Sequence, residues 1–232
     1  MSADPSWAAD RNGHDGLITA RSPRSVTADA YRTLRTNLQF SSIDRDLRTL
    51  LVTSAGQGDG KTTVAANHGV ALAESGLRVL LVDCDLRRPG LHAIFGLPLS
   101  PGLTNALVQE GTEPVTSAAG VPGLSVLTAG DPPPNPAEFI ASARLRALLE
   151  RLSGGVDLVL IDSPPVGLVA DAAALAPSVD GVILVVSAGR TKRDLAQRAK
   201  QQLDNVGARV LGAVLNNVKL EGKVREYYAT GR

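Results

Sequence analysis

The sequence predicts one α/β domain in which a doubly wound, mostly parallel sheet carries helices on both faces. Continuous apolar runs, typical of buried parallel strands, alternate with segments of helical spacing. A glycine-rich loop ending in Lys61-Thr62-Thr63 stands between the first such run and the first long helical segment. Aspartates directly follow two of the other runs, where a parallel sheet gathers its strand ends into one crevice.

Composition limits the classes of protein that the chain can belong to. Its 232 residues suffice for one domain with a buried core, and its 24 basic and 23 acidic side chains nearly cancel. A nucleic-acid partner is not expected, because backbone neutralisation needs a concentrated basic surface. The single cysteine, Cys84, excludes an intramolecular disulfide and fits a reducing compartment. The sequence contains no signal-peptide core and no apolar run of the ~20 residues that span a bilayer, so we expect a cytoplasmic protein.

The chain divides into three parts by composition. Residues 1–25 are polar and lack periodicity, which predicts a mobile N-terminal arm. Residues 26–219 form the predicted domain, and residues 220–232 form a polar C-terminal tail. No internal repeat or linker divides the domain further.

Local patterns predict each element in order. Apolar runs predict strands at 47–53, 78–83, 124–128, 156–162, 181–187 and 210–215. Helical spacing predicts helices at 28–40, 61–75, 136–152 and 191–205, with one or two short helices within 91–110. Gly76 suits the C-terminal cap of the second helix and Pro136 the first position of a later one. Thr191, with Asp194 three residues on, predicts a capped helix start.

Residues 54–63 read SAGQGDGKTT and predict a phosphate-binding loop between a strand and a helix. Glycines let backbone N–H groups turn inward around phosphate oxygens, and the helix N-terminus adds its positive dipole end. Lys61 can reach the terminal phosphates, and the Thr62 hydroxyl can join a Mg²⁺ shell. The predicted nucleotide contacts in the loop are Gly56, Gly58, Asp59, Gly60, Lys61, Thr62 and Thr63. Ala55 replaces the first glycine of the strict pattern, but the flanking strand and helix disfavour a chance match.

Three aspartates follow strands at the same predicted edge of the sheet. Asp83 and Asp85 follow one strand in LLVDCDLRRP, and Asp162 ends another in LVLIDSPP. Their carboxylates can converge on one Mg²⁺–nucleotide, and a spare carboxylate could accept a proton from an attacking hydroxyl. Each aspartate alone could be a turn former, but two such strand ends beside a phosphate loop favour function. Cys84 between them is interpreted as a packing residue, because neighbouring carboxylates would raise its pKa.

From about residue 17 to residue 228, the sequence resembles the cytoplasmic kinase domain of bacterial tyrosine kinases that serve capsule and exopolysaccharide production. The segment 28–40, ADAYRTLRTNLQF, is similar to the N-terminal segment of that family. SAGQGDGKTT resembles its Walker A loop of the deviant type, LLVDCDLRRPGLH its Walker A′ motif, and LVLIDSPPV its Walker B motif. The A′ string is the most specific of these. The resemblance implies a P-loop fold, with ATP and Mg²⁺ as cofactors.

The resemblance also implies catalytic roles. Lys61 would bind and polarise the phosphates, and Thr62 would ligate Mg²⁺. Asp85 and Asp162 would hold the metal, largely through water. Asp83 would be the base for an incoming tyrosine hydroxyl.

In the family, Glu-x-x-Arg-x-x-Arg on the first helix joins subunits into a ring. This chain carries Asp29, Arg32 and Arg35 at those positions, which implies contact with other copies of itself. The alternative is a solvated charge pattern on a surface helix.

Family members also carry a C-terminal tyrosine cluster that one subunit phosphorylates on its neighbour. Here the cluster is reduced to Tyr227 and Tyr228, the implied phosphoacceptors; alternatively, both tyrosines pack the last segment. Asn216 and Asn217 lie where related ATPases place an adenine contact, and satisfying a strand-end turn is the alternative.

Because no transmembrane segment is evident, the resemblance implies a membrane adaptor protein whose cytoplasmic tail activates and recruits the kinase. Two rival functions remain. One is a positioning ATPase of the chromosome-partitioning or division-site type, whose signature lysine is replaced here by Gly56. The other is a nucleotide-gated assembly factor without kinase activity. The three histidines, at 14, 68 and 92, have no spacing that suggests a metal site.

Overall fold

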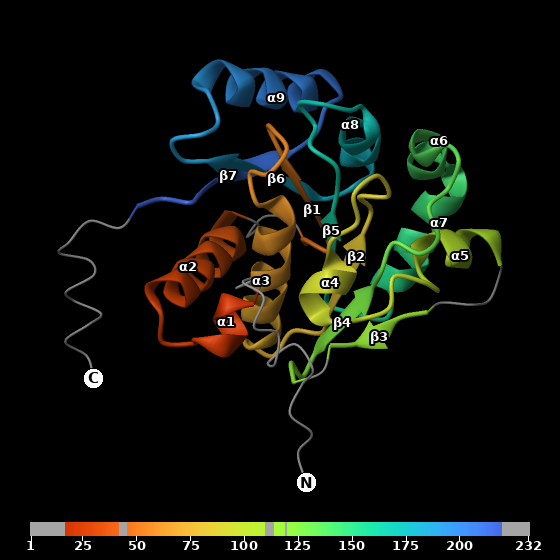
Figure 1. The fold of residues 1–232 in the computed structure, drawn as a ribbon, viewed down its shortest axis with the longest axis horizontal. Helices are drawn as coiled ribbons and strands as arrows, with labels where there is room; N and C mark the ends of the chain where they lie inside the picture. The colour runs from red at the N-terminus through yellow and green to blue at the C-terminus, as the bar shows by residue number, and fades with distance from the viewer. Residues whose placement is uncertain (1–16, 42–45, 110–113, 119, 220–232) are drawn as a thin grey trace, which may run out of the picture.

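A computed structural model describes residues 17–41, 46–109, 114–118 and 120–219 of the chain. Within them, seven strands form one sheet in the order β3-β4-β2-β5-β1-β6-β7 (Figure 1). The strands are β1 (Thr49–Ser54), β2 (Val79–Asp83), β3 (Thr116–Ser117), β4 (Leu124–Leu127), β5 (Leu158–Asp162), β6 (Gly181–Ser187) and β7 (Val210–Asn216). Every pair is parallel except β3 with β4, which confirms the predicted doubly wound, mostly parallel sheet.

Helices cover both faces of this sheet (Figure 1). They are α1 (Ile18–Arg21), α2 (Val26–Ser41), α3 (Lys61–Ala73), α4 (Leu91–Phe95), α5 (Leu103–Val108), α6 (Pro136–Ala141), α7 (Ala143–Ser153), α8 (Asp171–Leu175) and α9 (Arg193–Asn205), with a 3₁₀ turn at Ala176–Ser178. Alternate strand residues enter separate cores: Leu50 and Val52 of β1 pack with α2 and α3, whereas Leu51 packs with α7 and α9. A strand buried on both faces needs an unbroken apolar run, which is why the runs predicted the strands.

The single helix predicted at 136–152 is wrong. The chain breaks at Ser142, whose φ of −69° and ψ of 145° are extended, so that α6 ends and α7 begins there. The Ser142 hydroxyl accepts a hydrogen bond from the Leu145 N–H at 3.1 Å. Serine is a favoured N-cap, and here the cap divides one helical pattern into two helices.

The predicted arm at 1–25 is also wrong in its last part. Residues from Leu17 onward include α1 and pack on α2 and α3, with Leu17 only 2% exposed. The Thr19 N–H donates to the Asn67 side chain of α3 at 2.9 Å, which fixes α1 on the domain.

The predicted cap of the last helix is wrong as well. The helix α9 begins at Arg193, and its N-cap residue Lys192 makes no side-chain capping bond. Thr191 instead accepts a hydrogen bond from the Ser187 N–H at 2.9 Å and closes the turn between β6 and α9. No helix in the described part of the chain is long and apolar enough to cross a bilayer.

Candidate functional site

The predicted phosphate loop joins the end of β1 to the start of α3, at the carboxyl edge of the sheet. Gly58 and Gly60 have φ values of +76° and +89°, a left-handed conformation that side chains resist. A Cβ at Gly60 would also overlap the amide of Asn216. The two glycines therefore allow both the turn of the loop and the close approach of β7.

Asp59 holds the loop in this shape through its side chain. One carboxylate oxygen accepts from the Gly56 N–H at 2.7 Å, and the other accepts from the Thr191 hydroxyl at 2.8 Å. The Asp59 carbonyl accepts from the Asn216 amide at 2.9 Å. Asp59 was predicted to contact nucleotide, but its side chain is 3% exposed and committed to the loop itself. Only its backbone remains for that role.

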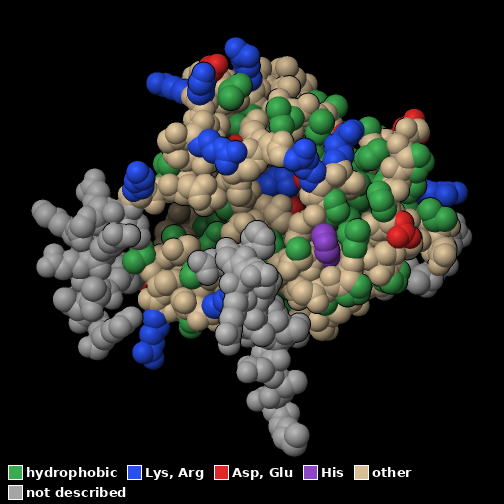
Figure 2. Space-filling view, in the orientation of Figure 1, with side chains coloured by type: hydrophobic (Ala, Val, Ile, Leu, Met, Phe, Trp, Pro, Cys, Tyr) green, Lys and Arg blue, Asp and Glu red, His purple; other side chains and the backbone are tan. Residues whose placement is uncertain are grey.

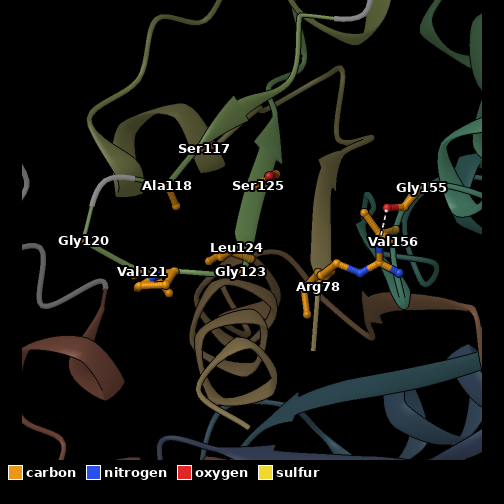
Figure 3. A pocket seen from close by; sticks show the side chains of 12 residues that line it. Arg78, Ser117, Ala118, Gly120, Val121, Gly123, Leu124, Ser125, Gly155 and Val156 are labelled. Atoms are coloured by element: carbon orange, nitrogen blue, oxygen red, sulfur yellow. Dashed lines mark hydrogen bonds between the residues drawn. The ribbon is translucent and has the colours of Figure 1, made fainter. Parts of the chain in front are cut away.

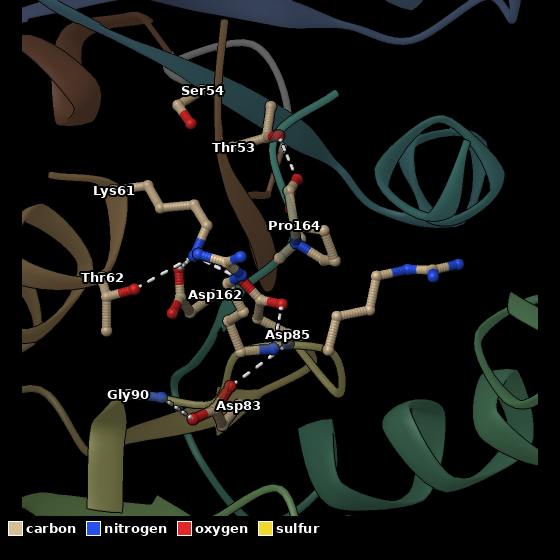
Figure 4. Close-up of polar contacts among 12 residues, drawn as sticks. Thr53, Ser54, Lys61, Thr62, Asp83, Asp85, Gly90, Asp162 and Pro164 are labelled. Carbon is tan, nitrogen blue, oxygen red and sulfur yellow. Dashed lines mark hydrogen bonds and ion pairs between the residues drawn. The ribbon is translucent and has the colours of Figure 1, made fainter. Parts of the chain in front are cut away.

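Lys61, Thr62, Asp85 and Asp162 come together as the sequence predicted (Figure 4). Lys61 Nζ lies 2.7 Å from Asp85 Oδ2, 3.6 Å from Asp162 Oδ1 and 3.1 Å from the Thr62 hydroxyl. Burial alone would lower the pKa of Lys61, but the carboxylates of Asp162 and Asp85 outweigh it and the pKa is raised. The ammonium is therefore a permanent positive charge at the mouth of the loop.

Asp162 is the least satisfied of the three aspartates. It has no exposed surface, and neither carboxylate oxygen has a hydrogen-bond partner among the described residues. Burial raises its pKa, and Lys61 opposes that rise. Its charge is balanced only by Lys61 at 3.6 Å, which Asp162 shares with Asp85, so these oxygens suit a bound cation or its hydration shell.

A Mg²⁺ ion fits these donors only if other ligands complete its shell. No group of three His, Cys, Asp or Glu side chains in the described residues is arranged to hold a metal. The Thr62 hydroxyl, water and phosphate oxygens would have to supply the remaining positions, which is how Mg²⁺ is commonly bound beside nucleotides.

Asp83 has a different environment from Asp162, although their strands are neighbours. One oxygen accepts from the Asp85 N–H at 3.1 Å, and the other accepts from the N–H groups of Gly90 and Leu91 at 3.0 Å each. Burial and then the Asp162 carboxylate raise the pKa of Asp83 to about 7, against those N–H groups and Lys61. Such a pKa suits a base at neutral pH. The carboxylate is fully buried, however, beneath the segment between β2 and α4 (residues 84–90), which we call the A′ loop.

Cys84 is also fully buried, as the packing interpretation predicted. Burial and then the neighbouring carboxylates raise the pKa of the Cys84 thiol well above its usual range. The thiolate is therefore suppressed.

The asparagines at the end of β7, Asn216 and Asn217, organise turns. Asn217 adopts a φ of 57°, and its amide donates to the Ser187 hydroxyl at 2.9 Å. With Asn216 bound to the loop carbonyl of Asp59, both side chains have the strand-end role that was the alternative to adenine contact. Asn216 also lines a hollow of about 440 Å³ between α2 and β7, so one side of it remains open to a ligand.

The three predicted oligomer-contact residues on α2 bind within the domain. Arg32 lies 2.7 Å from Asp29 and 3.6 Å from Glu74 of the segment after α3. Arg35 donates to the Ala71 carbonyl at 2.8 Å. These bonds fasten α2 to α3, and a subunit contact through the same groups would have to compete with them.

The predicted phosphoacceptors Tyr227 and Tyr228 lie outside the described residues. The third tyrosine, Tyr31 of α2, is 7% exposed, and burial raises its pKa to about 12.

Sequence reasoning missed the contribution of two neighbouring segments. In the A′ loop, Arg87 pairs with the buried Asp171 of α8 at 2.7 Å. In the turn before α9, Arg190 donates to the Gly58 carbonyl at 3.2 Å. The string LRRP could have indicated the first residue, but no local pattern indicates the second. On the face of the molecule that Figure 2 shows, many Lys and Arg side chains lie in the upper half.

Another hollow lies at the opposite edge of the sheet, at the amino ends of β2 and β4 (Figure 3). Its volume is about 440 Å³, and glycines and small side chains make up most of its lining. Its charged member, Arg78, already pairs with Asp157 at 2.7 Å. This hollow is therefore not the candidate site, which the phosphate loop and the carboxylates form at the carboxyl edge of the sheet.

The fold and the site define a P-loop nucleotide-binding protein of the deviant Walker A type. The family model described as NUBPL iron-transfer P-loop NTPase matches residues 47–224. Tyrosine-protein kinase YwqD of Bacillus subtilis (strain 168) is 41% identical over 91% of this chain and 89% of its own length. The kinase domain of Escherichia coli tyrosine kinase ETK superimposes with a TM-score of 0.83 at 32% identity, over 87% of this chain and 79% of that one. The chimerical protein CapA2B2 does so with a TM-score of 0.84 at 35% identity, over 88% and 91%.

The chain belongs to the bacterial tyrosine-protein kinase family.

Proposed function

We propose that this chain transfers the γ-phosphoryl group of Mg²⁺·ATP to tyrosine, in the control of capsular or exopolysaccharide synthesis or export. The observation that carries the proposal is the placement of Lys61 between Asp85 and Asp162 at the mouth of a glycine loop. The names of the relatives specify tyrosine as the acceptor of their reaction.

Each residue of the site has a task in this reaction. Lys61 draws the phosphates inward, and the Thr62 hydroxyl, Asp85 and Asp162 would hold the Mg²⁺, the carboxylates largely through water. The metal, when bound, neutralises charge on the phosphates. The tyrosine oxygen forms a bond to the γ-phosphorus, the bond to the β–γ bridging oxygen breaks, and ADP leaves. The hydroxyl proton passes to a carboxylate.

Asp83 is our candidate for that carboxylate because its pKa is about 7. Its burial under the A′ loop requires that loop to open when the acceptor binds. Asp83→Asn tests the assignment: a base is required if kcat falls at least about 100-fold while ATP affinity is kept. A loss of both together would mean that Asp83 supports the A′ loop instead.

The acceptors proposed within this chain are Tyr227 and Tyr228 of a second copy, reached while the copies are assembled. Assembly through Asp29, Arg32 and Arg35 would exchange their present bonds to the domain for bonds to a neighbour. A membrane adaptor with a cytoplasmic tail would recruit the cytoplasmic kinase to the membrane and activate it. Adding such a tail without any gain in rate would count against that partner.

The deciding experiment is mass spectrometry of the purified protein incubated with Mg²⁺·ATP. We expect phosphate on Tyr227 or Tyr228, its loss in Lys61→Met, and its loss from the tail in Tyr227→Phe/Tyr228→Phe. The matched control is Lys200→Met, which removes an exposed lysine of α9 that pairs with Asp204. ATP binding without phosphotyrosine, even with adaptor tails, would identify a nucleotide-gated assembly or positioning ATPase instead.

A further inference from the structure

Arg190 stands at the rim of the phosphate loop, in the turn between β6 and α9. Its guanidinium donates to the Gly58 carbonyl at 3.2 Å. A Cβ at Gly58 would lie 2.9 Å from two guanidinium nitrogens, so a side chain at residue 58 would displace the guanidinium from its present position. The contact joins two segments that are 132 residues apart in the sequence.

The backbone of the turn is fixed on the loop independently of the Arg190 side chain. The Arg190 and Thr191 N–H groups both donate to the Ser187 carbonyl, at 3.2 and 2.9 Å. The Thr191 hydroxyl donates to Asp59 of the loop at 2.8 Å. These bonds hold residue 190 beside the loop whether or not its side chain binds the Gly58 carbonyl.

The Arg190 guanidinium is underused in this position. It has five N–H donors, and within the described part of the chain its side-chain bond is to the neutral Gly58 carbonyl at the exposed surface. A bond of this kind is worth little, whereas a guanidinium bound to phosphate is charge-assisted and can be bidentate.

The balance of charge in the site favours a second cationic group beside the phosphates. Lys61 already lies between two carboxylates, Asp85 and Asp162, which draw on its positive charge. The polyphosphate of a nucleotide brings several further negative charges. Within the phosphate loop at residues 54–63, Lys61 is the only cationic residue.

We infer that Arg190 leaves the Gly58 carbonyl when nucleotide binds and becomes a second cationic ligand of the phosphates, across the loop from Lys61. This inference rests on the proposed use of ATP. It assigns to the β6–α9 turn a role in binding, through a residue that belongs to none of the Walker motifs.

The test compares Arg190→Gln, Arg190→Lys and the control Arg193→Gln by calorimetric titration with Mg²⁺·ATP and Mg²⁺·ADP. Glutamine can still donate to the Gly58 carbonyl, but it carries no charge. We expect Arg190→Gln to weaken ATP binding about 10-fold, and ADP binding by less because ADP carries less charge. Arg190→Lys should recover part of the loss, and Arg193→Gln should bind as the wild type does.

Two results would overturn the inference. One is ATP affinity in Arg190→Gln within twofold of wild type. The other is an equal loss for both nucleotides accompanied by a lower melting temperature of the nucleotide-free protein, which would show that Arg190 only supports the loop. A wild-type protein that binds ATP but forms no phosphotyrosine would refute the proposed kinase function and leave this comparison valid.

Discussion

Asp162, at the carboxyl edge of the sheet, has an environment opposite to that of the aspartates at the amino edge. At the amino edge, Asp180 accepts hydrogen bonds from the N–H groups of Arg48 and Thr49 and from the Thr49 hydroxyl, at 2.8–2.9 Å. Asp157 at the same edge accepts from the Arg78 N–H and guanidinium. At the carboxyl edge, Asp162 is fully buried without a hydrogen-bond partner in the described part of the chain.

From this difference we infer a structural role for the amino-edge carboxylates and propose a functional one for Asp162. A carboxylate that caps backbone N–H groups at the surface stabilises the start of a strand at little desolvation cost. A buried carboxylate whose oxygens lack donors lowers the stability of the nucleotide-free protein. Among the carboxylates of the described residues, only that of Asp162 is buried without a hydrogen-bond partner, and it lies beside the phosphate loop, where a ligand can supply the missing interactions.

The largest effect is expected from Asp162→Asn, which removes the unsatisfied charge and keeps the shape. Phosphotransfer should fall about 1,000-fold or more, because Mg²⁺ bound as proposed would lose one of the two carboxylates that hold it. The nucleotide-free protein should be more stable by about 1 kcal/mol, because a buried charge becomes neutral while Lys61 keeps Asp85. Kinase assays and urea unfolding measure the two effects. A less stable variant would mean that Asp162 is structural, as the amino-edge aspartates are.

The sequence predicted the carboxyl edge better than the features around it. The glycine loop, Lys61 and the strand-end aspartates follow from local patterns, because strand, turn and helix are adjacent in the chain. The partners of Asp59 do not, because Thr191 and Asn216 reach the loop from more than 130 residues away. Thr191 was assigned to a helix cap from its neighbours, and tertiary contact overrode that local preference. The break at Ser142 could have been predicted from its capping residue, but the longer helical pattern concealed it.

His68 of α3 can be compared with Asp162, because it is also a buried polar side chain but lies away from the phosphate loop. It lines a cavity of about 260 Å³ with Leu47 and Asp157, and neither ring nitrogen has a hydrogen-bond partner among the described residues. Burial and then the Arg35 charge lower its pKa to about 3. In the unfolded chain His68 therefore becomes protonated near pH 6.5, whereas in the folded protein it stays neutral down to about pH 3. The free energy of unfolding therefore falls as the pH drops below 6.5.

Between pH 7.5 and pH 5, this group alone should cost the folded protein about 2 kcal/mol. His68→Leu should remove that part of the pH dependence and keep phosphotransfer, because the residue lines a cavity with Asp157 at the amino edge of the sheet and not the phosphate loop. Urea unfolding at both pH values measures the effect, with His92→Leu as the matched control. An unchanged pH dependence in His68→Leu would show that the imidazole is protonated, and so partnered, in the folded protein.

The smallest effect is expected from Asp180→Ala at the amino edge. The variant loses three hydrogen bonds at a half-buried surface position, so its free energy of unfolding should fall by about 1 kcal/mol. Its affinity for Mg²⁺·ATP should not change, because the start of β1 lies a full strand length from the loop. Asp162→Asn and Asp180→Ala thus move stability in opposite directions, although each removes one carboxylate from an end of the same sheet. If Asp180→Ala weakened nucleotide binding as well, β1 would transmit strain between the edges, and the separation of structural from functional charge would fail.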